Sequence, residues 1–168
     1  DRIWKKRETA AKLLVDWGPE SVPVLLKKLN VEKNDEFYWI LHVLGHFEDK
    51  IARAEVLKYL GHEDSELRSY ALRSVAICKT HSNSRLLFPL LSDQNWAVRK
   101  LAFESLLSFG PLLLDDLRQL LFDGKEEPAH PVVALFVKIG GEAVLGELSK
   151  LYQEGSFGIR YSLIVSLG

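Results

Sequence analysis

The sequence predicts an all-α fold, a right-handed α-solenoid assembled from two-helix repeats. The first observation is a motif that returns at a fixed distance: Arg68 and Arg99, 31 residues apart, each follow an apolar residue and stand three positions before an alanine. The second is an apolar periodicity that fits helices, with no segment alternating as a strand does. Because a fixed period of this length is the signature of repeat architectures, we expect stacked helical pairs.

The same offset, extended in both directions, divides the chain into repeats of 30 or 31 residues. The predicted repeats begin at Lys6, Glu36, Leu67, Val98, Pro128 and Ile159. This gives one domain over residues 1–168, with five complete repeats and a partial sixth. We expect the chain to be a segment of a longer protein in which the array continues.

Apolar residues recur at equivalent positions of the repeats, and these positions are the predicted core. Four positions after each start stand Ala10, Ile40, Ala71, Ala102, Val132 and Leu163. Eight positions after each start stand Leu14, Leu44, Val75, Leu106, Phe136 and Leu167. Eleven positions after five of the starts stand Trp17, Phe47, Cys78, Phe109 and Ile139. In the second half of the repeats, Leu29, Tyr59, Leu90, Leu121 and Leu151 share one position. Offsets of 4, 8 and 11 place these residues on one face of a helix.

Each repeat is expected to contain a first helix, a tight turn and a second helix. Gly18, Gly110 and Gly140 lie where a first helix should end, and a proline follows two of them. Glycine readily takes the left-handed conformation that ends helices, and proline cannot continue one. Ser65 and Asn95 stand before the first helices of their repeats, as N-caps do. Such a pair buries its apolar face only by stacking on its neighbours.

The pattern apolar-Arg-x-x-Ala, then leucine, a glycine turn and a leucine-rich second helix, resembles the short HEAT-like repeats of the phycobilisome-lyase type. Residues 91–99, LSDQNWAVR, match the boundary between such repeats closely. Phe37 and Ala129 depart from the pattern, since arginine is expected at their positions. The resemblance covers nearly the whole chain and implies a solenoid whose second helices line a concave face where partners dock.

The composition fits a globular protein and counts against binding nucleic acid. Hydrophobic residues make up 47% and charged residues 27% of the chain, and the formal net charge is −1. Proteins that bind the nucleic-acid backbone usually carry a strong basic excess. Similarity to HEAT-repeat DNA glycosylases would imply a basic concave face, yet Asp115, Asp116, Glu142 and Glu147 fall in predicted second helices. A nucleic-acid module is therefore an alternative, as is a chromophore lyase, which only the name of the repeat suggests.

Four arginines recur at the second position of their repeats: Arg7, Arg68, Arg99 and Arg160. They could form a ladder that binds phosphate groups. The other interpretation is structural, with each guanidinium tying a turn between repeats and Asp64 or Asp93 as a partner. We favour the structural interpretation, because a recurring position usually serves stacking.

Other candidate residues do not combine into a catalytic or metal-binding group. His42 and His46 have the four-residue spacing with which two imidazoles can meet one metal ion, but no third ligand is evident. Cys78 shares its position with aromatic and aliphatic residues of other repeats, so we interpret it as a small core residue. The chain carries neither a nucleophile elbow nor a phosphate loop. We therefore expect no enzyme activity, no metal and no cofactor.

The leading functional hypothesis is a scaffold that binds another protein. The predicted binding row, on the side of the second helices opposite the core, is Lys27, Lys58, Arg85, Phe88 and Gln119. Phe88 would be its anchor, since aromatic residues dominate interface energetics. The alternative is an ordinary solvated face with one isolated aromatic residue.

The amino-terminal residues 1–7 carry four basic residues beside Trp4. They suit the polar cap of a terminal repeat, and they also suit the cytoplasmic flank of a membrane span that precedes the chain. A single cysteine forms no internal disulfide and does not indicate an oxidising compartment. We expect a cytoplasmic protein, with tethering to a membrane left open.

Overall fold

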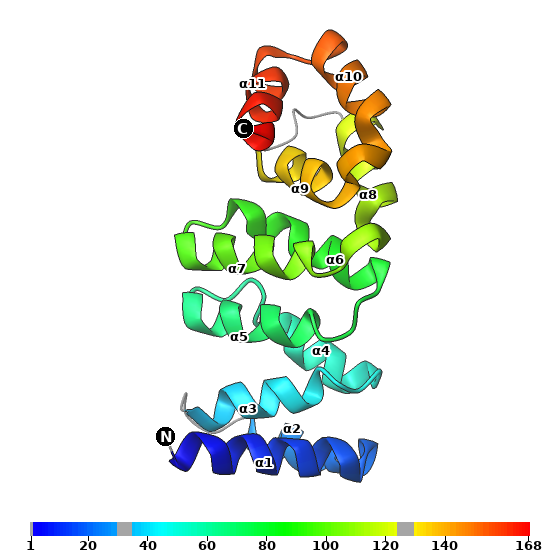
Figure 1. Cartoon of the computed structure of the whole chain (residues 1–168). Helices are drawn as coiled ribbons and strands as arrows, with labels where there is room; N and C mark the ends of the chain where they lie inside the picture. The colour runs from blue at the N-terminus through cyan, green and yellow to red at the C-terminus, as the bar shows by residue number, and fades with distance from the viewer. Residues whose placement is uncertain (1, 30–34, 124–129) are drawn as a thin grey trace. The chain divides into compact units, whose positions relative to one another are not determined.

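The computed structural model describes residues 2–29, 35–123 and 130–168, and every regular element in these ranges is helical (Figure 1). The α-helices are α1 (Arg2–Trp17), α2 (Val22–Lys28), α3 (Asp35–Leu44), α4 (Lys50–Lys58), α5 (Ser65–Val75), α6 (His81–Leu87), α7 (Trp96–Leu107), α8 (Leu114–Arg118), α9 (His130–Gly140), α10 (Leu145–Glu154) and α11 (Phe157–Leu167). Short 3-10 or π segments precede or extend some of them: η1 (Pro19–Ser21), η2 (Phe88–Ser92), η3 (Gly110–Leu113), η4 (Gln119–Asp123) and η5 (Gly141–Val144). The all-α prediction is confirmed.

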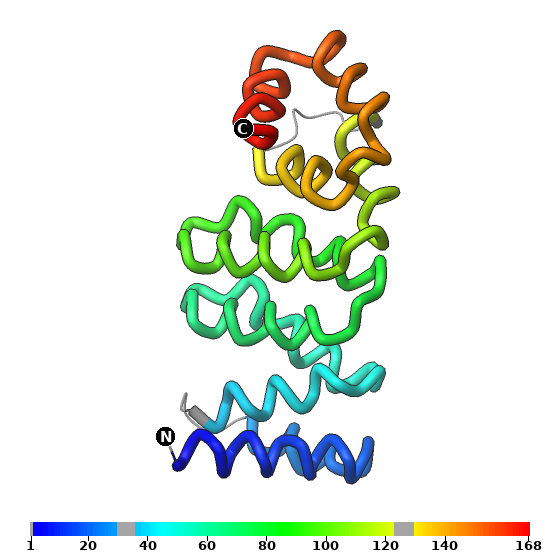
Figure 2. Tube along the Cα trace, viewed as in Figure 1, coloured from blue at the N-terminus to red at the C-terminus, as the bar shows by residue number. Residues whose placement is uncertain are grey.

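The chain divides into two compact units, Asp1–Cys78 and Lys79–Gly168. The division falls inside the third predicted repeat, whose first helix α5 belongs to unit 1 and whose second helix α6 belongs to unit 2. Figure 2 follows the backbone of each unit as first and second helices alternate.

In unit 1 the first helices pack on one another in sequence order. Helix α3 lies between α1 and α5 and contacts both (Figure 1). Helix α2 contacts α4. Leu41, Leu44 and Leu72 are at most 1% exposed at the contact between α3 and α5. A repeat therefore buries its apolar side chains against its neighbour, as expected for helical pairs without a core of their own.

Unit 2 repeats the same arrangement with α9 at its centre. Helix α9 contacts both α7 and α11, and α8 and η4 also pack against it. Leu106, Leu135 and Phe136 are fully buried there. The η2 segment covers α7, so the end of one second helix packs on the first helix of the next repeat.

Most predicted core positions are buried, and the residues that are exposed lie in α1 and α11, the first and last helices of the chain. Among the residues four and eight positions after the predicted repeat starts, those that are buried are Ile40, Ala71, Ala102, Val132, Leu163, Leu44, Val75, Leu106 and Phe136. The prediction is wrong for Ala10 and Trp17, which are exposed, and for Leu167, which is 63% exposed. Helix α1 packs on α3 by one side only, so Ala11 is buried there instead of Ala10.

Trp17 shows the largest error, because 61% of it is exposed. The other residues predicted at that position are partly buried, apart from Phe109, which is buried. Trp17 is the last residue of α1, directly before the turn at Gly18. The sequence position is shared, but its burial depends on neighbouring helices on both sides.

The predicted caps and turns are largely present. Asn95 caps α7 by accepting a hydrogen bond from the backbone N–H of Ala97, whereas α5 is capped by Asp64, with Ser65 as its first residue. Gly18 and Gly110 have the left-handed φ values of 96° and 60°. In the fifth predicted repeat the left-handed residue is Gly141 rather than Gly140, because α9 continues through Gly140.

Four of the second helices, α2, α4, α6 and α8, have nine residues or fewer, whereas α10 has ten. Helix α8 has five residues and α6 has seven, and each continues into a 3-10 or π segment. Pro89 and Pro111 lie in η2 and η3, where proline removes an N–H donor that a continuing α-helix would need. The chain therefore keeps helical packing in these segments with a changed hydrogen-bond pattern.

Candidate functional site

Three of the four recurring arginines bind the backbone of the turns that precede their helices. Arg68 Nη1 donates to the carbonyl oxygens of His62 (2.7 Å) and Glu63 (2.8 Å). Arg99 Nη1 makes the equivalent pair of bonds to Asp93 (2.7 Å) and Gln94 (3.1 Å), and Arg160 Nε donates to Gly155 at 2.9 Å. The structural interpretation is confirmed for these three residues.

The residues of the predicted binding row lie in both units. Lys27 in α2 and Lys58 in α4 are exposed residues of unit 1. In unit 2, Arg85 and Gln119 are exposed and Phe88, the first residue of η2, is partly buried. The row as a binding surface stays a prediction.

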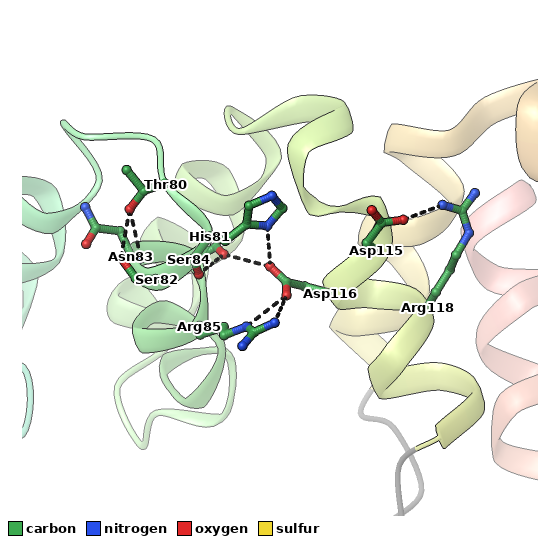
Figure 3. Close-up of polar contacts among 9 residues, drawn as sticks. All are labelled: Thr80, His81, Ser82, Asn83, Ser84, Arg85, Asp115, Asp116 and Arg118. Atoms are coloured by element: carbon green, nitrogen blue, oxygen red, sulfur yellow. Dashed lines mark hydrogen bonds and ion pairs between the residues drawn. The ribbon is translucent and has the colours of Figure 1, made fainter.

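Arg85 also forms an ion pair with a buried carboxylate, shown in Figure 3. Asp116 in α8 is 4% exposed, and its Oδ1 receives bonds from Arg85 Nε (2.9 Å) and Nη2 (2.8 Å). On its other oxygen, Oδ2, His81 Nδ1 and Ser84 Oγ each lie at 3.1 Å. Burial alone would raise the pKa of Asp116, but the bonds from His81, Arg85 and Ser84 outweigh it and lower the pKa.

This network joins the second helices α6 and α8. His81 and Ser84 both face the same carboxylate oxygen, so the imidazole does not act on the hydroxyl as a general base would. The group therefore satisfies a buried charge and stabilises the contact between helices.

A second ion pair joins α8 to α10. Arg118 donates to Glu147 from Nε (2.7 Å) and Nη2 (3.3 Å), and its Nη1 bonds Asp115 at 2.9 Å. These bonds raise the pKa of Arg118, and the bond to Glu147 has the largest effect. Three acidic residues of the predicted second helices thus serve as partners of arginines.

A candidate for binding in unit 1 is a hollow of about 600 Å³ between α1 and α3. Its lining, here called the aromatic hollow, is Trp4, Glu8, Ala11, Lys12, Val15, Asp16, Tyr38, Trp39, His42 and His46. The Trp4 ring lies 4.8 Å from that of Trp39 and stacks on Tyr38 at 5.7 Å. The sequence carried a signal for this site, because the aromatic and histidine residues follow helical spacing on two successive first helices.

One polar atom of the aromatic hollow has no partner. Trp39 Nε1 is buried and makes no hydrogen bond to any residue in the described part of the chain. A buried donor left unsatisfied costs about 1–3 kcal/mol. A bound hydrogen-bond acceptor would recover that cost.

His42 and His46 belong to the aromatic hollow, with ring centroids 5.1 Å apart. Burial lowers the pKa of His42, and the neighbouring His46 lowers it further. Partial burial also lowers the pKa of His46. Among the residues that the structure describes, no group of three histidine, cysteine or carboxylate side chains could hold a metal ion.

Cys78 is partly buried, and its Sγ lies 3.4 Å from the carbonyl oxygen of Gly45. The prediction of a core position is thus met only in part. The thiol contacts the turn that follows α3, in keeping with a structural role.

The sequence matches no family model, and no curated protein matches it. Within the described ranges, no helix is both long enough and apolar enough to cross a membrane.

Proposed function

We propose that this protein is a non-catalytic scaffold, a right-handed HEAT-like solenoid that binds a segment of another protein. The observation that carries the proposal is the aromatic hollow between α1 and α3. Its clustered rings offer a large, stiff contact surface of the kind that dominates protein interfaces. The site lies on first helices, so it adds to the predicted row on the second helices.

The charges of the aromatic hollow favour a cationic segment. Lys12 is paired with Glu8 at 2.8 Å, while Asp16 makes no ion pair with a described residue. The lowered pKa values of His42 and His46 keep both imidazoles uncharged at neutral pH. A lysine or arginine of the partner would then meet aromatic faces and a carboxylate, an arrangement that attracts cations.

The cytoplasm is the compartment we propose, with the partner protein there. Trp4 packs on Tyr38 and Trp39, so the aromatic residue beside the basic amino terminus has a role within unit 1. This supports the interpretation of residues 1–7 as the cap of a terminal repeat over that of a membrane-flanking segment.

A peptide titration tests the proposal. A short labelled peptide of leucine and arginine should bind, and a counterpart with glutamate in place of arginine should bind more weakly. Trp4→Ala should weaken binding of the arginine peptide at least tenfold, about 1.4 kcal/mol, at a temperature where circular dichroism shows the variant to be fully folded.

Trp17→Ala is the matched control, since Trp17 is an exposed tryptophan of the same helix outside the aromatic hollow. Fluorescence anisotropy measures the affinities, and circular dichroism measures the melting. If both variants bind as the wild type does, or if the arginine peptide does not bind, the aromatic hollow is not the binding site.

A further inference from the structure

A second hollow, of about 540 Å³, lies in unit 2 over the first helices α7, α9 and α11. The residues that give it its character, here called the basic hollow, are Trp96, Arg99, Lys100, Phe103, His130 and Lys138. The four from α7 are spaced three, four and seven apart, which places them on one face of that helix. His130 and Lys138 lie eight apart on α9, two turns along one face.

The ionisable side chains that line the basic hollow are all basic. No aspartate or glutamate side chain lines the hollow among the residues that the structure describes, although the chain as a whole has a net charge of −1. Lys138 makes no ion pair with a described residue, and Lys100 approaches the exposed Glu104 only at 3.8 Å. An exposed pair of this kind contributes little, so both ammonium groups remain available to a ligand.

Arg99 is positioned in advance. Its Nη1 donates to the carbonyl oxygens of Asp93 and Gln94, which fixes the guanidinium beside the hollow. A guanidinium has five N–H donors, so others remain for an anion. A cation that is already ordered loses less entropy when it binds.

The hollow also has an apolar side. Trp96 is 66% exposed, and the partly buried Phe103 lies one turn beyond the cations on the same helix. A volume of about 540 Å³ exceeds what one phosphate or carboxylate group fills. The lining therefore suits a ligand that brings both anionic oxygens and an apolar side chain.

We propose that the basic hollow binds an acidic peptide segment of a partner protein. Arg99, Lys100 and Lys138 hold its carboxylate or phosphate oxygens, and an apolar side chain of the segment packs on Trp96 and Phe103. The inference rests on the proposed function in taking a protein segment as the occupant. The basic hollow differs from the aromatic hollow in its position, in the unit that contains it and in the sign of the ligand charge that it favours. A polynucleotide fits less well, because the chain as a whole has a formal net charge of −1 and lacks the basic excess that binding along a phosphate backbone usually requires.

The test uses the full chain and four labelled probes. These are a short peptide of glutamate and leucine, the same peptide with phosphoserine for two glutamates, a lysine version, and oligothymidine of similar length. Both acidic peptides should bind, with affinity that falls as salt is added, and the lysine version should not. Tighter binding of the phosphoserine peptide identifies phosphate as the preferred anion, and equal binding identifies carboxylate; either outcome supports the proposal.

Lys138→Glu should weaken binding of the acidic peptides at least tenfold. Lys28→Glu is the control, because it makes the same charge change at an exposed lysine of α2. If Lys138→Glu reduces the helical signal in circular dichroism, Lys100→Gln replaces it, with an expected loss of about threefold.

Three results would overturn the proposal: equal binding of acidic and lysine peptides, equal loss in the Lys28 control, or oligothymidine binding as tight as that of the peptides. Trp4→Ala should leave the acidic peptides bound. Failure of the aromatic hollow and failure of the basic hollow are therefore separate outcomes.

Discussion

His42 lies between Tyr38, Trp39 and His46, and its ring is about half buried by these aromatic neighbours. Such surroundings remove water from an imidazolium, so the folded protein favours the neutral form. Protonation of His42 should therefore destabilise the packing of the aromatic hollow.

We expect unit 1 to lose stability in mild acid. The pKa of His42 is lowered below its ordinary value of 6.5, so the unfolded chain takes up the proton first as pH falls. The contribution of neutral His42 to stability is fully present above pH 6.5, and it is lost as the pH falls through the lower pKa that His42 has in the folded protein. His42→Gln should reduce this pH dependence in thermal melts between pH 7.5 and 5, buffers chosen to span the ordinary pKa of about 6.5.

Glu8, Lys12, Asp16, Tyr38 and His46 are the other titratable residues of the aromatic hollow. Glu8 has a pKa lowered by its bond to Lys12, so it stays charged throughout that range. Protonation of His42 and His46 adds positive charge to the aromatic hollow, so binding of a cationic peptide should weaken together with stability in acid. An identical pH dependence in wild type and His42→Gln would show that His42 does not carry the effect.

At the scale of elements, the contact between α3 and α5 depends on the absence of a side chain at Gly45. The Ser74 hydroxyl donates to the carbonyl oxygen of Leu41, and Cys78 lies against the carbonyl of Gly45. A Cβ on Gly45 would come closer than 3.0 Å to both the side chain and the carbonyl oxygen of Ser74. Backbone atoms cannot move aside cheaply in a packed interface.

Gly45→Ala should therefore destabilise the protein by about 1–3 kcal/mol, the usual cost of overpacking. Gly61→Ala is the control, because a Cβ there would meet nothing within 4 Å. It should be neutral or slightly stabilising, since alanine restricts the unfolded chain more than glycine does. Chemical denaturation with urea measures both, and equal stabilities would mean that α3 and α5 pack less closely than described.

The helical elements were predictable because burial recurs with the helical period and glycines follow the ends of several helices. The position of Ala71 and Ala102 is an example, since both are fully buried. Whether a predicted core residue is buried also depends on the neighbouring helices. Ala10 and Trp17 each stand at a predicted core position, yet both are exposed because α1 packs on another first helix by one side only. Local periodicity does not show which helix stands at the edge of a unit.

The candidate sites were harder to predict for a similar reason. The resemblance placed binding on second helices, while both hollows lie on first helices. Arg85 was predicted as a binding residue, and its bond to Asp116 joins residues 31 positions apart in the chain. Pairing across repeats depends on how helices stack, which the sequence of one repeat does not contain.

At the scale of the whole chain, the boundary between the two compact units does not coincide with a repeat boundary. Unit 2 begins at Lys79 and so includes α6 and η2 but not α5. The η2 segment covers α7, and α6 supplies three of the side chains that bind Asp116. A cut at residue 98, the predicted start of the next repeat, would remove all of these contacts.

We therefore expect residues 79–168 to fold alone, and residues 98–168 to be much less stable. The shorter fragment lacks the N-cap Asn95 and the first two residues of α7, and it leaves the rest of α7 without its η2 cover. It also keeps the Asp116 carboxylate without Arg85, Ser84 or His81. Losing partners of a buried carboxylate costs about 1–3 kcal/mol, and exposing apolar residues of α7 adds to that cost. Thermal melts followed by circular dichroism should show a cooperative transition for 79–168 and a broad or absent one for 98–168. In a uniform array, each repeat would instead add a similar increment, so both fragments would melt cooperatively and differ only in proportion to their length. That second result would favour a single continuous array that spans residues 1–168, as the sequence predicts. Unit 2 would then not be an independently folding unit.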